Sequence, residues 1–340
     1  MSGKMPREIA PGVFWIGDCL ALRHKGKIYH AYNAAFLVAG ETASCLIETG
    51  HPKDFPIIQR HINELFARHV APLKYLFVTH QETPHCGGLG RLLKIYPEAI
   101  LCGDVSDYHL AFPQYEHRMR WMKEGDEIDL GGRTLMAVEP VIRDLPTTWW
   151  GFDSRERVLF PGDGFAYSHY HEDGHCGLVA EEAVSLDLPD VSSTFADLAL
   201  FWTKFADMKV YCDRLDHLIK RLDVKTIAPT HGLPITDVKA TVPKVQEGLK
   251  AAALMPESGT NEKVSLTGTG SATPVAWATN DSSFISTTTG GDHWLRRDRL
   301  MLIASSQCLS SWCSFGYSAV SLRQCIILTE RARPSASGRG

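Results

Sequence analysis

The stretch Thr79-His-Gln-Glu-Thr-Pro-His-Cys-Gly-Gly88 decides the prediction of fold and function for this chain of 340 residues. The apolar run Tyr75–Thr79 that leads into it predicts a buried strand. Two imidazoles and a carboxylate follow, from His80, Glu82 and His85, and these ligands suit zinc, iron or manganese better than calcium or magnesium. The two glycines let the loop pass close to another group and enter a helix. The stretch therefore predicts a metal-binding loop at the end of a strand.

Three further segments with strand character end in a polar group where the chain turns. These are Ser44–Glu48, Val158–Asp163 and Thr226–His231. A sheet fixes the backbone at such strand ends, and the loops that follow bring side chains together at one edge. We therefore expect these terminal side chains to meet the His80–Gly88 loop in one metal site.

Strand-like and helix-like segments alternate along the first three quarters of the chain. The expected strands are Val13–Gly17, Asn33–Val38, Ser44–Glu48, Tyr75–Thr79, Ile100–Gly103, Thr134–Glu139, Val158–Pro161 and Thr226–Pro229. The expected helices are Asp54–Arg68, with Asp54 as its cap, Gly88–Ile95, most of Ser193–Leu222, and Asp237–Ala253. This order predicts the α/β class. No GxGxxG or GxxxxGK[ST] motif indicates nucleotide chemistry.

The motif His80-x-Glu82-x-x-His85, followed by Cys-Gly-Gly, resembles the metal motif of the metallo-β-lactamase superfamily. Its glutamate is the variant found in flavodiiron proteins and related oxygen-binding diiron domains. Leu-Phe-Pro-Gly-Asp163 is similar to the family's bridging aspartate, and Ile-Ala-Pro-Thr-His231-Gly to its last histidine. The resemblance spans about residues 10 to 250. It implies a four-layered αβ/βα sandwich with the metals at one edge of the sheets.

The resemblance also implies two metal sites, the second of which is one ligand short. Carried over residue by residue, metal one has His80, Glu82, Asp144 and the bridging Asp163, and metal two has only His85, Asp163 and His231. Asp144 stands where the family has a histidine, and Pro84 stands where it has an aspartate. A carboxylate can replace an imidazole, whereas proline offers no donor. The second site is therefore expected to be empty or to be completed by water or substrate.

Other side chains have expected roles around the metals. Glu48, in Leu-Ile-Glu-Thr-Gly, matches an early acidic residue of the family and is expected to orient a ligand rather than bind metal. Asp163 and Glu82 are the expected catalytic carboxylates. Trp149, Phe165 and His171 are the expected substrate contacts, because aromatic residues and histidines follow the Asp144 and Asp163 loops. The alternatives are that the histidines at 169, 171 and 175 line a polar loop and that Asp144 caps a turn.

Three functions fit this site. The first is a metal-dependent hydrolase that uses metal-bound hydroxide on a small, aromatic ester- or ether-type substrate. The second is a diiron protein that binds or reduces oxygen or nitric oxide with a separate electron donor, as the glutamate-containing motif implies. The third is a non-catalytic subunit paired with a homologous active chain, which Pro84 and Asp144 suggest. The sequence slightly favours the hydrolase, because the flavodoxin-like reducing domain of flavodiiron proteins is missing.

The expected cofactors are one or two divalent metal ions, zinc or iron, with manganese as a further option. Residues 256–340 are too short and too irregular for a flavodoxin-like domain, so no flavin is expected in this chain. The expected partners are a small-molecule substrate and either a second copy of the chain or a homologous subunit. The net charge of -4 gives no reason to expect nucleic acid or an anionic membrane. Without an apolar run of roughly 20 residues or a signal sequence, the cytoplasm is the expected compartment.

The composition changes near residue 255. We expect residues 1–255 to form the metallo-β-lactamase-like domain and the Ser/Thr/Gly-rich residues 256–340 to form a disordered extension. The nine cysteines stand singly along the chain, without a CxxC pair. The sequence therefore indicates neither a disulfide framework nor a zinc ribbon.

Overall fold

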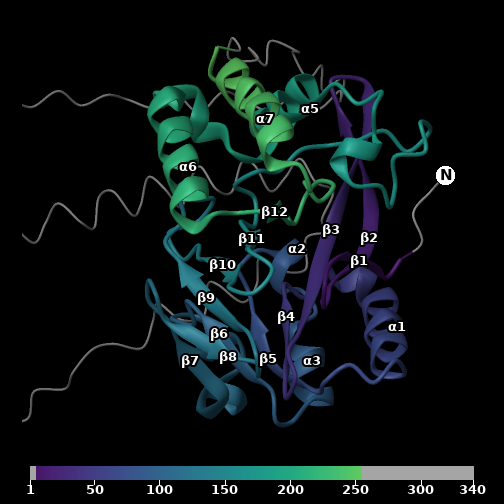
Figure 1. Cartoon of the computed structure of the whole chain (residues 1–340), viewed down its shortest axis with the longest axis vertical. Coiled ribbons are helices and arrows are strands. Elements are labelled where there is room, and N and C mark those ends of the chain that lie inside the picture. Colours follow the sequence, from purple (N-terminus) through teal and green to yellow (C-terminus); the bar gives the residue numbers. More distant parts are fainter. Residues whose placement is uncertain (1–4, 255–340) are drawn as a thin grey trace, which may run out of the picture. The chain divides into compact units, whose positions relative to one another are not determined.

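Two β-sheets form the centre of the fold in the computed structural model, which describes residues 5–254 (Figure 1). The first sheet has the strand order β1-β2-β3-β4-β5-β6-β7. Its strands are β1 (Arg7–Ala10), β2 (Val13–His24), β3 (Lys27–Ala39), β4 (Ser44–Ile47), β5 (Leu73–Phe77), β6 (Ile100–Gly103) and β7 (Met119–Trp121). The pairs from β1 to β4 are antiparallel, and those from β4 to β7 are parallel. The predicted extension 256–340 lies outside the described residues.

The second sheet has the order β12-β11-β10-β9-β8. Its strands are β8 (Glu127–Asp129), β9 (Thr134–Val138), β10 (Trp150–Asp153), β11 (Val158–Phe160) and β12 (Thr226–Ile227). Only the β11–β12 pair is parallel. In each sheet, two neighbouring parallel strands therefore end at the same edge, and the sequence placed the polar motifs at the ends of β4, β5, β11 and β12.

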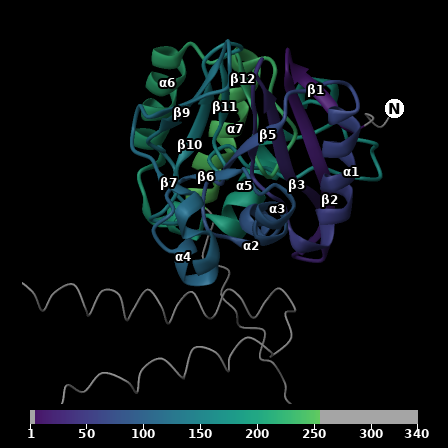
Figure 2. The same cartoon turned by 90° about the horizontal axis from the view of Figure 1, so that it is seen from below.

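Helices cover the outer faces of the sheets. They are α1 (Phe55–Phe66), α2 (Thr83–Cys86), α3 (Leu89–Ile95), α4 (Tyr108–Ala111), α5 (Leu188–Ala199), α6 (Met208–Leu222) and α7 (Val238–Ala253), with short 3-10 turns at Pro52–Asp54, Pro113–Arg118, Ala180–Glu182 and Phe201–Phe205. Figure 2 shows α6 and α1 on opposite sides, with the strands between them. No helix within residues 5–254 is both long and apolar enough to cross a membrane.

Alternating side chains explain the layers. Phe36 of β3 points inward and meets Phe160 of β11, with 5.5 Å between the ring centroids, so the two sheets face each other. Its neighbour Leu37 points outward and joins the cluster that contains Ile58 of α1 and Leu92 of α3. The predicted four-layered αβ/βα sandwich is confirmed.

The structure corrects several predicted elements. β2 and β3 form one long hairpin, because Lys25 and Gly26 both adopt the left-handed conformation that a tight turn requires. β10 was missed because it is only four residues long and contains Gly151, which weakens the strand signal. The helical run Ser193–Leu222 is interrupted between α5 and α6 by the 3-10 turn. The Asp54 side chain does not cap α1; it accepts a hydrogen bond from Asn33 instead.

Candidate metal centre

Six side chains with metal-ligating groups converge at the strand ends. His80, Glu82 and His85 lie in the loop after β5, Asp144 lies after β9, Asp163 after β11 and His231 after β12. Their donor atoms form three overlapping groups, each within 4.8 Å: His80, Glu82 and His85; His80, Asp144 and Asp163; His85, Asp163 and His231. All six residues that the sequence predicted as ligands are therefore brought together.

The two carboxylate oxygens of Asp163 face different partners. Oδ1 lies 3.4 Å from Nε2 of His85 and 3.6 Å from Nε2 of His231. Oδ2 lies 3.8 Å from Nε2 of His80, which is itself 3.6 Å from Oδ2 of Asp144. These separations are too long for strong hydrogen bonds and are typical of atoms that share a cation. Following the ligand sets that the family resemblance implies, we call His80, Glu82, Asp144 and Asp163 Oδ2 the first donor set. His85, His231 and Asp163 Oδ1 are the second donor set.

Three atoms at this centre are buried and lack a hydrogen-bond partner among the described residues: Nε2 of His80, Nε2 of His85 and Oδ1 of Asp163. The histidines are 1% and 0% exposed. A buried polar atom without a partner is costly, by about 1–3 kcal/mol. Bound cations would satisfy all three atoms, so the residues present fit a metal centre.

Glu48 contacts the His80–Gly88 loop through the side chain of His85. Its Oε1 lies 3.0 Å from Nδ1 of His85 and accepts hydrogen bonds from the hydroxyls of Thr79 and Thr230, the latter at 3.2 Å. Glu48 has a φ of 62°, a left-handed conformation that is uncommon for residues other than glycine. Because Nδ1 of His85 is engaged, Nε2 is left to point toward Asp163. Neither threonine was predicted to have this role, since a single hydroxyl in a strand-end motif carries no pattern.

Burial and neighbouring charges set the protonation of the metal-free centre. Burial, followed by the charge of His85, lowers the pKa of His80 well below its usual range, and burial lowers that of His231. Burial also opposes protonation of His85, but the charges of Glu48 and Asp163 raise its pKa well above the usual value. The His80 and His231 rings are thus neutral, the form that binds a cation.

The three carboxyl groups of the centre repel one another. Burial, followed by the charges of Asp163 and Glu82, raises the pKa of Asp144 to about 8, and burial also raises that of Glu82. Burial by itself would raise the pKa of Asp163. The charges of the nearby His85 and His231 outweigh it and hold that pKa below the usual range. Without a cation, Asp163 is ionised, and the raised pKa of about 8 leaves Asp144 mostly protonated at neutral pH.

Pro84 lies in the first turn of α2, where a missing N–H costs no hydrogen bond. The helix therefore tolerates proline here, but the second donor set gains no atom from it. That set has three protein donors, and the first has four.

The three predicted substrate contacts lie in different surroundings. Trp149 is partly buried, and its backbone N–H donates to the Thr79 carbonyl at 2.8 Å. Phe165 is fully buried against Trp150, in the core between the sheets. His171 is exposed, stacks on His30 and lies 3.0 Å from Sγ of Cys176. Of the three, only Trp149 has a backbone contact with the strand end that carries the metal motif.

The fold and the donors define a metal-binding protein of the metallo-β-lactamase superfamily. The chain matches the family model described as "ODP family beta lactamase" over residues 32–232, more than half of its length, and it belongs to that family.

The chain is similar to proteins with named activities. It is 25% identical to the coenzyme F420H2 oxidase of Methanocaldococcus jannaschii, over 71% of this chain and 59% of that protein. It is also 25% identical to the nitric oxide reductase of Moorella thermoacetica, over 68% of this chain and 57% of that protein. The chain thus spans less than two thirds of the length of these relatives.

Among solved structures, the rubredoxin oxygen:oxidoreductase of Desulfovibrio gigas superposes with a TM-score of 0.57 and 18% identity, covering 74% of this chain and 62% of that one. This likeness supports the fold.

The relatives contradict the hydrolase interpretation, because they are named as oxidases and reductases. An enzyme and bound metal are supported, whereas a zinc hydrolase is not. The hydrolase interpretation rested on the missing flavodoxin-like segment, whereas the glutamate-containing motif favoured the diiron alternative.

Proposed function

We propose that this chain is the metal-binding domain of an oxidoreductase that holds two iron ions and reduces oxygen or nitric oxide. The observation that carries the proposal is the convergence of six donors, four of them buried, around Asp163, whose two carboxylate oxygens face different histidines. The names of the relatives, which include an F420H2 oxidase and a nitric oxide reductase, support this chemistry over the alternatives. Imidazole and carboxylate ligands without a thiolate suit iron.

In this proposal the first donor set holds one ion and the second donor set holds the other. Two iron ions, when bound, supply electrons to a small diatomic ligand. Glu48 fixes the ring of His85 through Nδ1, and Thr79 and Thr230 fix Glu48 in turn. Asp144, whose pKa is raised to about 8, would lose its proton when its carboxylate becomes a ligand, so metal uptake would release a proton.

The second donor set has three protein ligands, which is the number expected where a substrate occupies a further position. Pro84 creates this opening, since it provides no donor. We propose that the small ligand binds on this side. We propose that a separate donor protein supplies the electrons. Oligomerisation and a cytoplasmic location stay predictions.

Metal analysis of the full chain, purified without oxygen, tests the proposal. We expect two irons per chain, a single iron in His80→Ala and in His231→Ala, and a loss of both in Asp163→Asn. His61→Ala is the matched control, because His61 is also buried but lies on α1 beside Gly17. It should keep both irons.

Activity is measured by the uptake of oxygen and of nitric oxide by chemically reduced protein. We expect turnover of at least one gas by the wild type and by His61→Ala, and none by Asp163→Asn. A chain that binds two irons but reduces neither gas would instead be an oxygen-binding or non-catalytic subunit. A chain with a single zinc at these residues would overturn the diiron assignment.

A further inference from the structure

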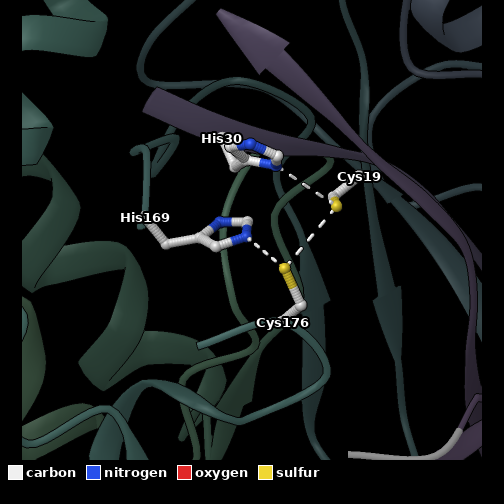
Figure 3. Close-up of side chains that lie close together, drawn as sticks. All are labelled: Cys19, His30, His169 and Cys176. Atoms are coloured by element: carbon white, nitrogen blue, oxygen red, sulfur yellow. Dashed lines mark hydrogen bonds between the residues drawn. The ribbon is translucent and has the colours of Figure 1, made fainter. Parts of the chain in front are cut away.

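A second cluster of metal-ligating side chains lies outside the candidate centre and shares no residue with it. Figure 3 shows Cys19, His30, His169 and Cys176 pointing toward one another. Sγ of Cys19 lies 3.6 Å from Sγ of Cys176 and 3.5 Å from Nδ1 of His30. Nε2 of His169 lies 3.3 Å from Sγ of Cys176. All four donor atoms lie within 4.8 Å of one another.

The fold brings these residues together from three segments. Cys19 on β2 pairs with Tyr32, and His30 is two residues from Tyr32 on β3, so Cys19 and His30 share a face of the hairpin. The loop after β11 then joins β3 as an extra bridge. The backbone N–H groups of His30 and His169 each donate to the other's carbonyl, at 2.8 and 2.7 Å. This bridge places His169, and Cys176 after it, against the hairpin.

The distances match a tetrahedral zinc site. A zinc ion with Zn–S of about 2.3 Å and Zn–N of about 2.0 Å would separate its sulfurs by about 3.8 Å and each sulfur from a nitrogen by about 3.5 Å. The observed Sγ–Sγ distance of 3.6 Å and the sulfur–nitrogen distances of 3.3 and 3.5 Å are close to these two expected separations. The sulfurs are too far apart for a disulfide, which requires about 2.05 Å.

We propose that Cys19, His30, His169 and Cys176 bind one zinc ion, which ties the loop after β11 to the β2–β3 hairpin. Two thiolates and two imidazoles in four-coordinate geometry are a structural zinc set with no open position. Thiolates distinguish this site from the oxygen-rich candidate iron centre, so the two sites select different metals.

The protonation of the two thiols is compatible with metal uptake. The hydrogen bond with Cys176, followed by burial, raises the pKa of Cys19 to about 11, and the same hydrogen bond lowers the pKa of Cys176. Cys176 is thus the readier thiolate, and Cys19 would release its proton when the ion binds. The ring of His169 is fully buried, and its Nδ1 has no hydrogen-bond partner among the described residues.

Cobalt substitution of the full reduced chain tests the proposal, because Co²⁺ bound by thiolates in a tetrahedral site gives strong ligand-to-metal and d–d absorption bands. We expect one such cobalt per chain, displaced by one equivalent of zinc. Cys19→Ala and Cys176→Ala should each weaken binding at least 100-fold. Both cysteines are only partly buried, so these variants should still fold, which circular dichroism would verify.

Matched variants separate this site from other sources of thiolate. Cys212→Ala removes a buried cysteine on α6, and His171→Ala removes an exposed histidine beside Cys176; both should keep the band, whereas His30→Ala should lose it. Asp163→Asn should also keep the band, so a failure of the proposed diiron function would not affect this result.

Several outcomes would overturn the zinc site. One is a thiolate band that survives the loss of both Cys19 and Cys176, as it would if Cys308, Cys313 and Cys325 held the ion. Another is the absence of any thiolate-bound cobalt in the wild type. A third is a Cys19–Cys176 disulfide found by mass spectrometry in protein kept under reducing conditions. Loss of the band in His171→Ala but not in His30→Ala would show that the four ligands are wrongly assigned.

Discussion

Nδ1 of His231 lies 2.5 Å from the backbone carbonyl oxygen of Tyr32. The contact leaves Nε2 of His231 to face Asp163, at 3.6 Å from Oδ1. The Tyr32 ring stacks on His169, with centroids 5.3 Å apart and planes at 21°. β3 therefore connects the second donor set to the cluster at Cys19, and the position of a proposed iron ligand depends on a strand that the proposed zinc site would anchor.

We expect Glu48→Gln to weaken metal binding at the second donor set. The amide keeps the shape of the side chain, but it removes the charge beside Nδ1 of His85, and loss of such an outer partner lowers metal affinity about 10–100-fold. Iron content and competition with a chelator would measure the loss. Glu247→Gln, an exposed change on α7, should leave both unchanged. An unaltered affinity in Glu48→Gln would mean that Glu48 does not tune the metal.

We expect Pro84→Asp to strengthen the second site. Aspartate would supply the carboxylate that this set lacks, and an acidic residue is favourable in the first turn of α2. The measurement is the dissociation constant of the more weakly bound ion. Pro84→Asn is the control, because it also removes the proline and has nearly the same size but no charge. Equal affinities in the two variants would exclude a new carboxylate ligand.

We expect Gly162→Ala to destabilise the chain by more than Gly125→Ala. Both glycines have positive φ, 55° and 81°, so alanine is strained at either site. At Gly162, however, the new Cβ would lie 2.7 Å from Oγ1 of Thr79, whereas at Gly125 it would meet nothing within 4 Å. We expect about 1 kcal/mol for Gly125→Ala and at least about 1 kcal/mol more for Gly162→Ala. Urea denaturation measures both.

Thr79 also donates to Glu48, so Gly162→Ala should in addition lower the iron content. Equal destabilisation in the two glycine variants would show that the close approach to Thr79 relaxes freely.

We expect Glu181→Gln to destabilise the chain at the start of α7 by about 1–2 kcal/mol at pH 7. The Glu181 carboxylate accepts hydrogen bonds from the backbone N–H and hydroxyl of Thr236, the Asp237 N–H and the Thr241 hydroxyl. Burial opposes ionisation of Glu181, but these donors lower its pKa below 4.5. The stabilisation by ionised Glu181 is therefore complete above pH 4.5, and it is lost as the pH falls through the pKa of Glu181 in the folded state.

The difference in unfolding free energy between the wild type and Glu181→Gln should accordingly shrink at acid pH. Urea denaturation at several pH values would measure this, with Glu127→Gln, an exposed change on β8, as the control. A difference that stays constant down to pH 3 would contradict the role of the charge.

The strand ends could be predicted from the sequence because each combines a short apolar run with a polar motif. His80, Asp163 and His231 follow such runs, and the strands themselves fix where these side chains meet. Asp144 follows no strand directly, and only its resemblance to a family position placed it at the centre.

Contacts between segments far apart in the chain could not be predicted from the sequence. Cys19 and Cys176 are 157 residues apart and stand singly, so no spacing rule connects them. The hairpin that carries Cys19 was not predicted. Only two separate strands, Val13–Gly17 and Asn33–Val38, were expected, because the outer half of the hairpin has partly exposed side chains and its Lys25-Gly26 turn is not one of the common turn pairs. The break between α5 and α6 contains neither proline nor glycine, and its aromatic residues gave no warning.

In the proposed diiron centre a single carboxylate, that of Asp163, serves both donor sets, so binding of one ion would affect binding of the other. Whatever ion first occupies Oδ2 of Asp163 changes the charge and orientation that Oδ1 offers to the next one. By thermodynamic reciprocity, each ion alters the affinity for the other by the same factor. Metal uptake by the proposed centre would thus be a coupled equilibrium, and a titration curve would contain a coupling free energy in addition to two intrinsic affinities.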